Sequence, residues 1–167
     1  MEIESTITNK QGETFKSIYH EGGDPTENLD GVILSGSGGH CFYGDKLVIV
    51  KSGNDWGFPG GGIEKGETWQ DAVVREVKEE SNMKVVHQEL IGYQDFYMKK
   101  HTLRHALSFC VVEPYGDFDT DPDNDITEIK LIDPKDFKNY INWGEIGDRI
   151  MEQATEMNDK YICKICI

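Results

Sequence analysis

Residues 57–83, GFPGGGIEKGETWQDAVVREVKEESNM, join a glycine loop to a segment with helical periodicity and three closely spaced carboxylates. Thr68 followed three residues later by Asp71 is typical of the capping box that opens a helix. Asn82 suits the left-handed residue that ends one. The sequence therefore predicts a helix from Thr68 to about Asn82, preceded by a loop with three consecutive glycines at 60–62.

The carboxylates of this helix are Glu76, Glu79 and Glu80, and their spacing places them side by side on one face. Like charges so placed repel, and the helix dipole disfavours anions in the last turns. A hard divalent cation removes this penalty because it takes oxygen ligands. The helix alone fits a solvated acidic face at least as well. The glycine loop before it can approach a ligand closely and shifts the balance toward a metal site.

At fixed spacing this segment resembles the Nudix box. The residues that stand at box positions are Gly61, Glu67, Arg75, Glu76, Val77, Glu79, Glu80 and Met83. The one departure is Asn82, where the box has glycine, and Asn tolerates a left-handed helix stop. The resemblance implies that Glu76, Glu79 and Glu80 bind the metal together with the carbonyl of Gly61. It further implies that Arg75 and Glu67 pair and hold loop and helix together as part of the catalytic apparatus.

The resemblance also implies an α/β fold, the Nudix-type α/β/α sandwich with a mixed sheet. The implied reaction is attack of water on phosphorus in a phosphoanhydride bond of a nucleoside diphosphate-linked compound, with Mg²⁺ or Mn²⁺ as cofactor. Such chemistry needs positioning and charge neutralisation more than covalent help. Glu79 or Glu80 is the first choice for the group that takes a proton, and Glu128 or Asp125 the second. Modified nucleoside triphosphates are the first substrate hypothesis, and dinucleoside polyphosphates the second.

The chain divides into an N-terminal extension, residues 1–28, and a Nudix hydrolase domain, residues 29–167. The extension holds a hairpin, Ile3–Ile7 with Thr14–Tyr19, packed on the domain. Strands and helices then mix without strict alternation, which favours a mixed sheet. We expect strands at 31–35, 46–51, 84–97, 103–113 and 128–131, a flexible turn at 35–39, and helices at 134–140 and 143–157.

The charge balance, 17 basic against 31 acidic residues for a net charge of −14, disfavours duplex nucleic acid as a partner. A small nucleotide remains compatible if a metal supplies positive charge. The chain has no apolar run of membrane-spanning length and no secretory signal at its acidic N-terminus, so a cytoplasmic monomer or homodimer is the default expectation.

Weaker candidates for substrate contact are Trp56, Tyr97 and Glu128. Trp56, Tyr93 and Phe96 could stack on a base, although buried core aromatics are the more usual explanation for such rings. Between Asp117 and Glu128, acidic residues nearly match a calcium-binding loop, but Pro122 stands where that loop needs glycine. Cys163 and Cys166 fit a plain terminal strand or tail in which cysteine acts as a small apolar residue.

Two rival functions stay open at this point. One is a catalytically silent Nudix-fold module that binds a nucleotide, which has no need of three crowded glutamates. The other is an acidic calcium-binding protein that uses the loop from Asp117 to Glu128.

Overall fold

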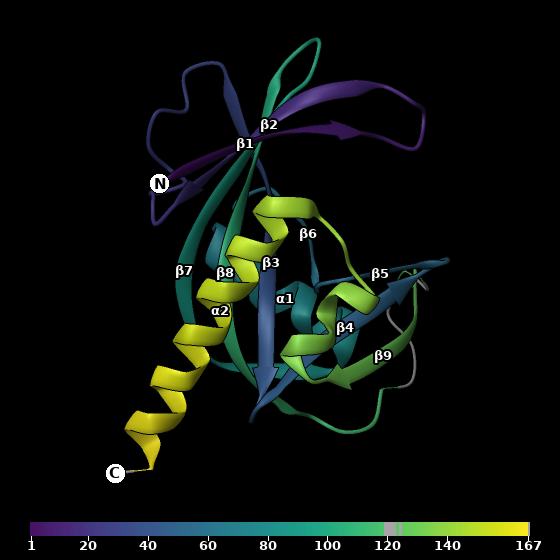
Figure 1. Cartoon of the computed structure of the whole chain (residues 1–167), viewed down its shortest axis with the longest axis vertical. Coiled ribbons are helices and arrows are strands. Elements are labelled where there is room, and N and C mark those ends of the chain that lie inside the picture. The colour runs from purple at the N-terminus through teal and green to yellow at the C-terminus, as the bar shows by residue number, and fades with distance from the viewer. Residues whose placement is uncertain (119–122, 124, 167) are drawn as a thin grey trace.

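The computed structural model describes residues 1–118, 123 and 125–166, and their centre is a nine-stranded sheet. Its main path runs β1 (Glu2–Thr8), β2 (Thr14–Glu21), β7 (Met83–Tyr97), β8 (Thr102–Pro114), β3 (Val32–Tyr43), β4 (Lys46–Ser52) and β5 (Asp55–Gly57). Off this path, β6 (Gly60–Gly62) pairs with β3, and β9 (Ile126–Ile132) pairs with β4 (Figure 1). β3 and β8 run parallel while the other pairs are antiparallel, so the expected mixed sheet is confirmed.

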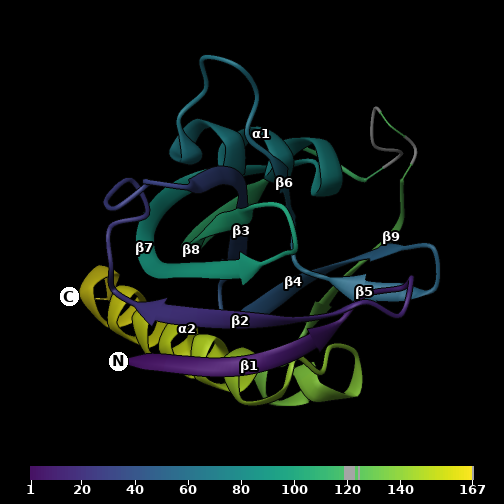
Figure 2. The ribbon, with the colours of Figure 1, turned by 90° about the horizontal axis from the view of Figure 1, so that it is seen from above.

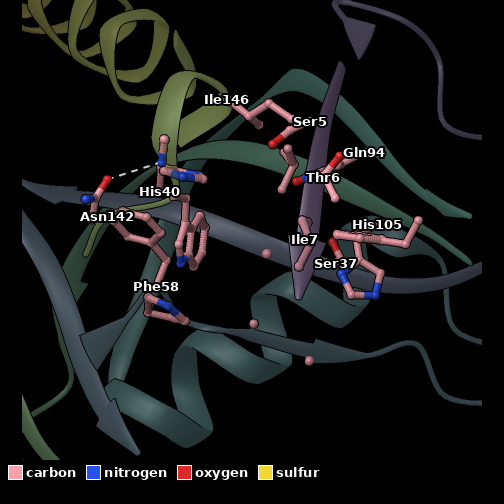
Figure 3. Close-up of a pocket in the computed structure, with 18 of the residues that line it drawn as sticks. Ser5, Thr6, Ile7, Ser37, His40, Phe58, Gln94, His105, Asn142 and Ile146 are labelled. Carbon is pink, nitrogen blue, oxygen red and sulfur yellow. Dashed lines mark hydrogen bonds between the residues drawn. The ribbon is translucent and has the colours of Figure 1, made fainter. Parts of the chain in front are cut away.

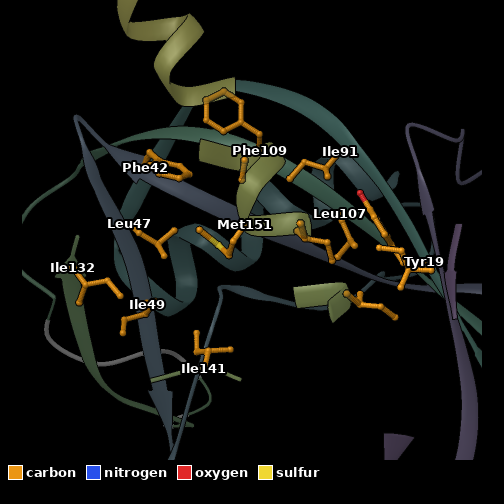
Figure 4. Close-up of a cluster of buried hydrophobic side chains, with 14 residues drawn as sticks. Tyr19, Phe42, Leu47, Ile49, Ile91, Leu107, Phe109, Ile132, Ile141 and Met151 are labelled. Atoms are coloured by element: carbon orange, nitrogen blue, oxygen red, sulfur yellow. The ribbon is translucent and has the colours of Figure 1, made fainter. Parts of the chain in front are cut away.

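Helices cover both faces of the sheet, as Figure 2 shows from above. α1 (Trp69–Ser81) lies on one face, and α2 (Gly144–Ile165) on the other, next to the 3₁₀ helix η1 (Pro134–Asn139). Each face has its own apolar core. Val73 and Val77 of α1 pack on a small cluster, whereas Ile150 of α2 joins a larger one that contains Phe42 and Phe109 (Figure 4). The expected α/β/α layering is therefore present.

The helix ends of α1 are set by the residues that the sequence singled out. Thr68 caps it, its hydroxyl accepts from the Asp71 N–H, and the Asp71 carboxylate accepts from the Thr68 N–H. Asn82 ends it in the left-handed region, with φ 52°, and its N–H donates to the carbonyl of Lys78. The predicted helix from Thr68 to about Asn82 is confirmed.

The glycine-rich stretch 35–39 is not a flexible turn, and that prediction was wrong. It lies inside β3, paired with β8 on one side and with β6 on the other. Its glycines allow neighbouring side chains to approach the backbone closely. A Cβ on Gly36 would lie 2.7 Å from the ring of His105, and one on Gly39 would lie 3.0 Å from Val73 Cγ2. A glycine-rich composition alone does not show whether the glycines permit close packing within a strand or form a flexible turn.

The N-terminal residues 2–21 form an antiparallel hairpin that is part of the main sheet, because β2 pairs with β7 along six residues from Lys16 to Glu21. Ile3 and Tyr19 of the hairpin are buried in the larger core. β1 is the edge strand of the sheet on this side, within the described part of the chain.

The C-terminal segment is the last part of α2 rather than the expected strand or tail. The helix runs to Ile165. Its buried residues recur at helical spacing as far as Asn158, and Tyr161, three residues further on, packs against His87. Cys163 and Cys166 are exposed thiols at its end. Among the described helices, none is both long and apolar enough to cross a membrane.

Candidate active site

The glycine loop and α1 meet at contacts that only glycine allows. The N–H of Gly60 donates to Glu80 Oε2 at 3.0 Å. The backbone of Gly61 packs against Glu76 so closely that a Cβ there would lie 2.5 Å from Glu76 Oε1. Strand β6, which contains both glycines, is held in place by its pairing with β3. The loop backbone therefore lies directly against two of the three predicted carboxylates.

Arg75 ties the loop to the helix. Its Nε donates to Glu67 Oε1 at 2.7 Å, and its Nη2 donates both to Glu67 Oε2 at 3.0 Å and to the carbonyl of Gly62 at 2.8 Å. This is the bidentate geometry that suits a guanidinium and a carboxylate. The hydrogen bond from Arg75 lowers the pKa of Glu67. The pairing of Arg75 with Glu67 that the motif implies is thus present.

The same guanidinium faces the carboxylate group of the helix. Arg75 Nη1 donates to Glu76 Oε1 at 2.7 Å and to Glu79 Oε2 at 3.2 Å. Even so, burial raises the pKa of Glu76 above its ordinary value, and the nearby charges of Glu79 and Asp123 add to that rise. One arginine does not neutralise this group of acids, which leaves the surroundings favourable to a further cation.

The donor chemistry fits a hard divalent metal, since it consists of carboxylate oxygens beside the backbone of Gly61. Within the described residues, however, no three acidic, histidine or cysteine side chains already surround one point at metal-binding distances. Arg75 engages Glu76 and Glu79, while Gly60 engages Glu80. The contact of Arg75 with Glu79 is the longest of these. Glu79 is also the more exposed of the two carboxylates on Arg75, 32% against 13% for Glu76, so it has more freedom than Glu76 to turn toward a cation.

The acidic segment after β8 lies beside the end of α1. Asn82 Nδ2 donates to the carbonyl of Asp117 at 3.0 Å, and Asp123 adds to the negative potential at Glu76. Glu128 lies in β9. The remaining acidic positions of the calcium-loop pattern, Asp119 and Asp121, lie outside the described residues, as does Pro122.

A cavity of about 700 Å³ opens on the other side of the glycine loop (Figure 3). Gly60 and Gly61 form part of its wall, so the loop separates the cavity from the carboxylates of α1. The size lies within the range of small-molecule sites. Its walls come from distant segments: Ser5–Thr8 of β1, Ser37, Gly38 and His40 of β3, Phe58–Gly61, Gln94 and Phe96 of β7, His105 and Leu107 of β8, and Asn142–Gly144 with Ile146.

Aromatic rings dominate one side of this cavity. The rings of His40 and Phe58 contact each other at a tilt of 39° with centroids 4.3 Å apart, and Phe58 meets Trp143 edge-to-face at 5.2 Å. Burial lowers the pKa of His40 to about 4, so its ring is neutral at pH 7. His40 Nδ1 and Ser37 Oγ are buried and lack a hydrogen-bond partner among the described residues. Unpaired buried polar atoms are uncommon, and they are often found at binding sites.

The three residues predicted as weak substrate contacts lie elsewhere, since none of Trp56, Tyr97 and Glu128 lines this cavity. The ring of Trp56 meets Tyr140 edge-to-face. Tyr97 lies under the ammonium group of Lys16, and Glu128 is 3.9 Å from Lys51 Nζ. Sequence reasoning missed the cavity because its walls are dispersed along the chain. The nearest signals were Phe96, one of the rings that could stack on a base, and Phe58 with Pro59, which precede the glycines directly.

Comparison with known proteins gives one family and one fold. The family model described as NUDIX domain matches residues 31–153. The RNA pyrophosphohydrolase of Hydrogenovibrio crunogenus is 33% identical over 79 residues, which cover 45% of this chain and 46% of that protein. That of Acinetobacter baylyi is 32% identical over 87 residues, 52% of this chain and 47% of that protein. The chain thus spans about half the length of the curated relatives it matches.

Solved structures extend the likeness in fold. A pyrophosphohydrolase of Bacillus subtilis has a TM-score of 0.59 at 17% identity, with 77% of each chain covered. An Ap4A hydrolase of C. elegans has a TM-score of 0.59 at 14% identity, covering 75% of this chain and 97% of that one. At these identities the likeness bears on the fold alone.

Proposed function

Since this chain belongs to the Nudix family, we propose that it hydrolyses a phosphoanhydride bond in a nucleoside diphosphate-linked compound, with Mg²⁺ or Mn²⁺ as cofactor. The observation that carries the proposal is the placement of two carboxylates of α1, Glu76 and Glu80, against the backbone of the glycine loop, with Glu79 beside Glu76 on the same arginine. A pure binding module needs no such concentration of negative charge, which is electrostatically unfavourable without a cation.

Glu76, Glu79 and Glu80, with the carbonyl of Gly61, would hold the metal. When bound, a divalent ion neutralises charge on phosphate oxygens and lowers the pKa of a bound water. The residues of the chain supply the framework for this. Arg75 and Glu67 fix the loop relative to the helix, and the N–H of Gly60 orients Glu80. Glu79, which is one-third exposed, is our choice for the group that accepts the proton of the attacking water.

The cavity across the loop suits the nucleoside part of the substrate. It is lined by aromatic rings, as expected for a surface on which a base stacks. Gly60 and Gly61 line the cavity on one side and contact Glu80 and Glu76 on the other, so phosphates that extend from the bound base across this loop would reach the carboxylates. Nucleoside triphosphates are therefore the first substrate class in our proposal.

A second candidate is a triphosphate at the 5′ end of RNA, because the curated relatives are described as RNA pyrophosphohydrolases. The net charge of −14 argues against extensive contact with a long nucleic acid, so we rank this substrate second and propose no binding of duplexes. A short RNA with a 5′ triphosphate separates the two classes directly.

The test is turnover of a panel of nucleotides by Glu79→Gln and Glu80→Gln with Mg²⁺ or Mn²⁺, measured as the phosphate that a coupled phosphatase releases from the products. We expect kcat to fall by roughly 10²–10⁴-fold in at least one of them, as is typical for loss of a general base or metal ligand. Glu89→Gln, the same change at an exposed carboxylate on β7, is the matched control and should leave kcat unchanged. Full activity in both α1 variants would eliminate the proposed mechanism.

A further inference from the structure

The N-terminal hairpin lies outside residues 31–153, the part of the chain that the family model matches, yet it forms a wall of the cavity. Four consecutive residues of β1 line that wall, from Ser5 to Thr8. Successive side chains of a strand point to opposite faces of the sheet. Four consecutive residues therefore cannot all line one cavity with their side chains. The edge of the strand must therefore face the cavity as well.

The hydrogen-bond register of the hairpin shows which groups face that edge. The N–H of Glu21 donates to the carbonyl of Met1 at 3.0 Å, which makes these two a hydrogen-bonded pair. In an antiparallel ladder such pairs alternate with pairs that are not hydrogen-bonded. Following the register, Ser5 bonds to Ser17 and Ile7 to Phe15. The intervening residues, Thr6 and Thr8, turn their N–H and C=O groups away from β2.

No described strand pairs with β1 on that outer side, so these backbone groups are free at the cavity wall. A free strand edge offers donors and acceptors in alternation. Ser5 and Ile7 are half-buried and add their side chains, while the side chains of Thr6 and Thr8 are exposed. In the view of Figure 3, Ser5, Thr6 and Ile7 stand on the opposite side of the cavity from His40, Phe58 and Asn142.

We propose that the free edge of β1 reads the nucleobase of the substrate, with the N–H and C=O of Thr6 as the central pair of contacts. A nucleobase presents a donor beside an acceptor on its edge, which matches the groups of an unpaired strand, and its flat faces match the aromatic rings across the cavity. The inference rests on the proposed function for the phosphates, but it concerns binding of the base alone. It makes the hairpin, which lies outside the residues that the family model matches, a specificity element of this chain.

The test is binding of adenosine, guanosine, cytidine and uridine to the full chain, without metal and without phosphate. Thr6→Pro removes the free N–H and leaves the β1–β2 ladder intact, because proline is tolerated at an unpaired strand edge. Glu4→Pro is the matched control, since the register gives Glu4 an equally free N–H and it does not line the cavity. We expect Kd for the preferred nucleoside to rise about tenfold in Thr6→Pro and less than twofold in Glu4→Pro.

Equal effects of the two proline variants, or no nucleoside binding by the unaltered chain at millimolar concentration, would overturn the inference. If Thr6→Pro does not fold, Thr8→Pro and Glu4→Pro give the same comparison, because the register leaves both N–H groups free and only Thr8 lines the cavity. Failure of the proposed hydrolysis is distinguishable from failure of this inference. In that case nucleotides are not cleaved, while nucleoside binding still depends on Thr6 and not on Glu4.

Discussion

The carboxylate site on α1 and the cavity across the glycine loop differ in how the chain supplies their residues. The carboxylates, Arg75, Glu67 and the glycines all come from residues 60–80, and their contacts form within one loop and one helix. The cavity takes its walls from β1, β3, β7, β8 and the start of α2. The first region therefore depends on local geometry and charge compensation, and the second on packing between distant segments.

The strongest test of the local region is Gly61→Ala. The new Cβ would lie 2.5 Å from Glu76 Oε1 and displace either the loop or the carboxylate. Small misplacements at an active site reduce rates by about a hundredfold, and we expect kcat/KM for the best nucleotide to fall by roughly 10²–10³-fold. Gly57→Ala is the control, because a Cβ there meets nothing within 4 Å. Equal activities of the two variants would remove the close-contact argument.

The strongest test of the cavity region is the pH dependence of stability. Burial lowers the pKa of His40 from 6.5 to about 4, so the folded state favours the neutral ring. The unfolded chain takes up the proton first, and stability is lost as pH falls from about 6.5 to about 4. The shift corresponds to about 3 kcal/mol between pH 7 and pH 4.

Denaturant unfolding at several pH values measures this loss. His40→Gln lacks the titrating group, and its unfolding free energy should depend on pH less steeply by about that amount. Parallel pH profiles of the two proteins would mean that His40 does not titrate as its burial implies.

Arg75→Ala should show how far the local region depends on one cation. The substitution leaves Glu67 and Glu76 without their main partner, and hydrogen bonds to charged groups contribute about 1.5–3 kcal/mol each. We expect the unfolding free energy to drop by about 2 kcal/mol and hydrolysis to fall as well. Arg149→Ala is the comparison, because Arg149 bridges Glu21 and Glu152 away from the glycine loop at similar exposure. It should lower stability and leave kcat unchanged.

The smallest expected effect is a gain in stability. Ser37 Oγ is buried in the cavity region without a hydrogen-bond partner among the described residues. Ser37→Ala removes that unpaired group, and an unsatisfied buried hydroxyl costs about 1–3 kcal/mol. We expect unfolding free energy to rise by about 1 kcal/mol, read from a denaturant midpoint. A loss of stability instead would show that the hydroxyl has a partner, such as a bound water.

The sequence by itself determined α1 and its surroundings, because capping, helical spacing and the pairing of Arg75 with Glu67 act over a few residues. It also indicated the mixed sheet and most strands. It wrongly placed Gly36 and Gly39 in a flexible turn. Glycine is needed at these positions because His105 and Val73, which are distant in the chain, approach the backbone closely. It likewise ended α2 too early, because the packing of Tyr161 on His87 is a long-range contact.

Only the tertiary structure decided which residues line the cavity. Phe58, His40 and Trp143 meet because β3, the glycine loop and the start of α2 converge, and no local pattern encodes that convergence. The hairpin reaches the same cavity through the pairing of β2 with β7. A charge cluster on one helix can be recognised from spacing alone, whereas a cavity exists only once separate segments have packed around it.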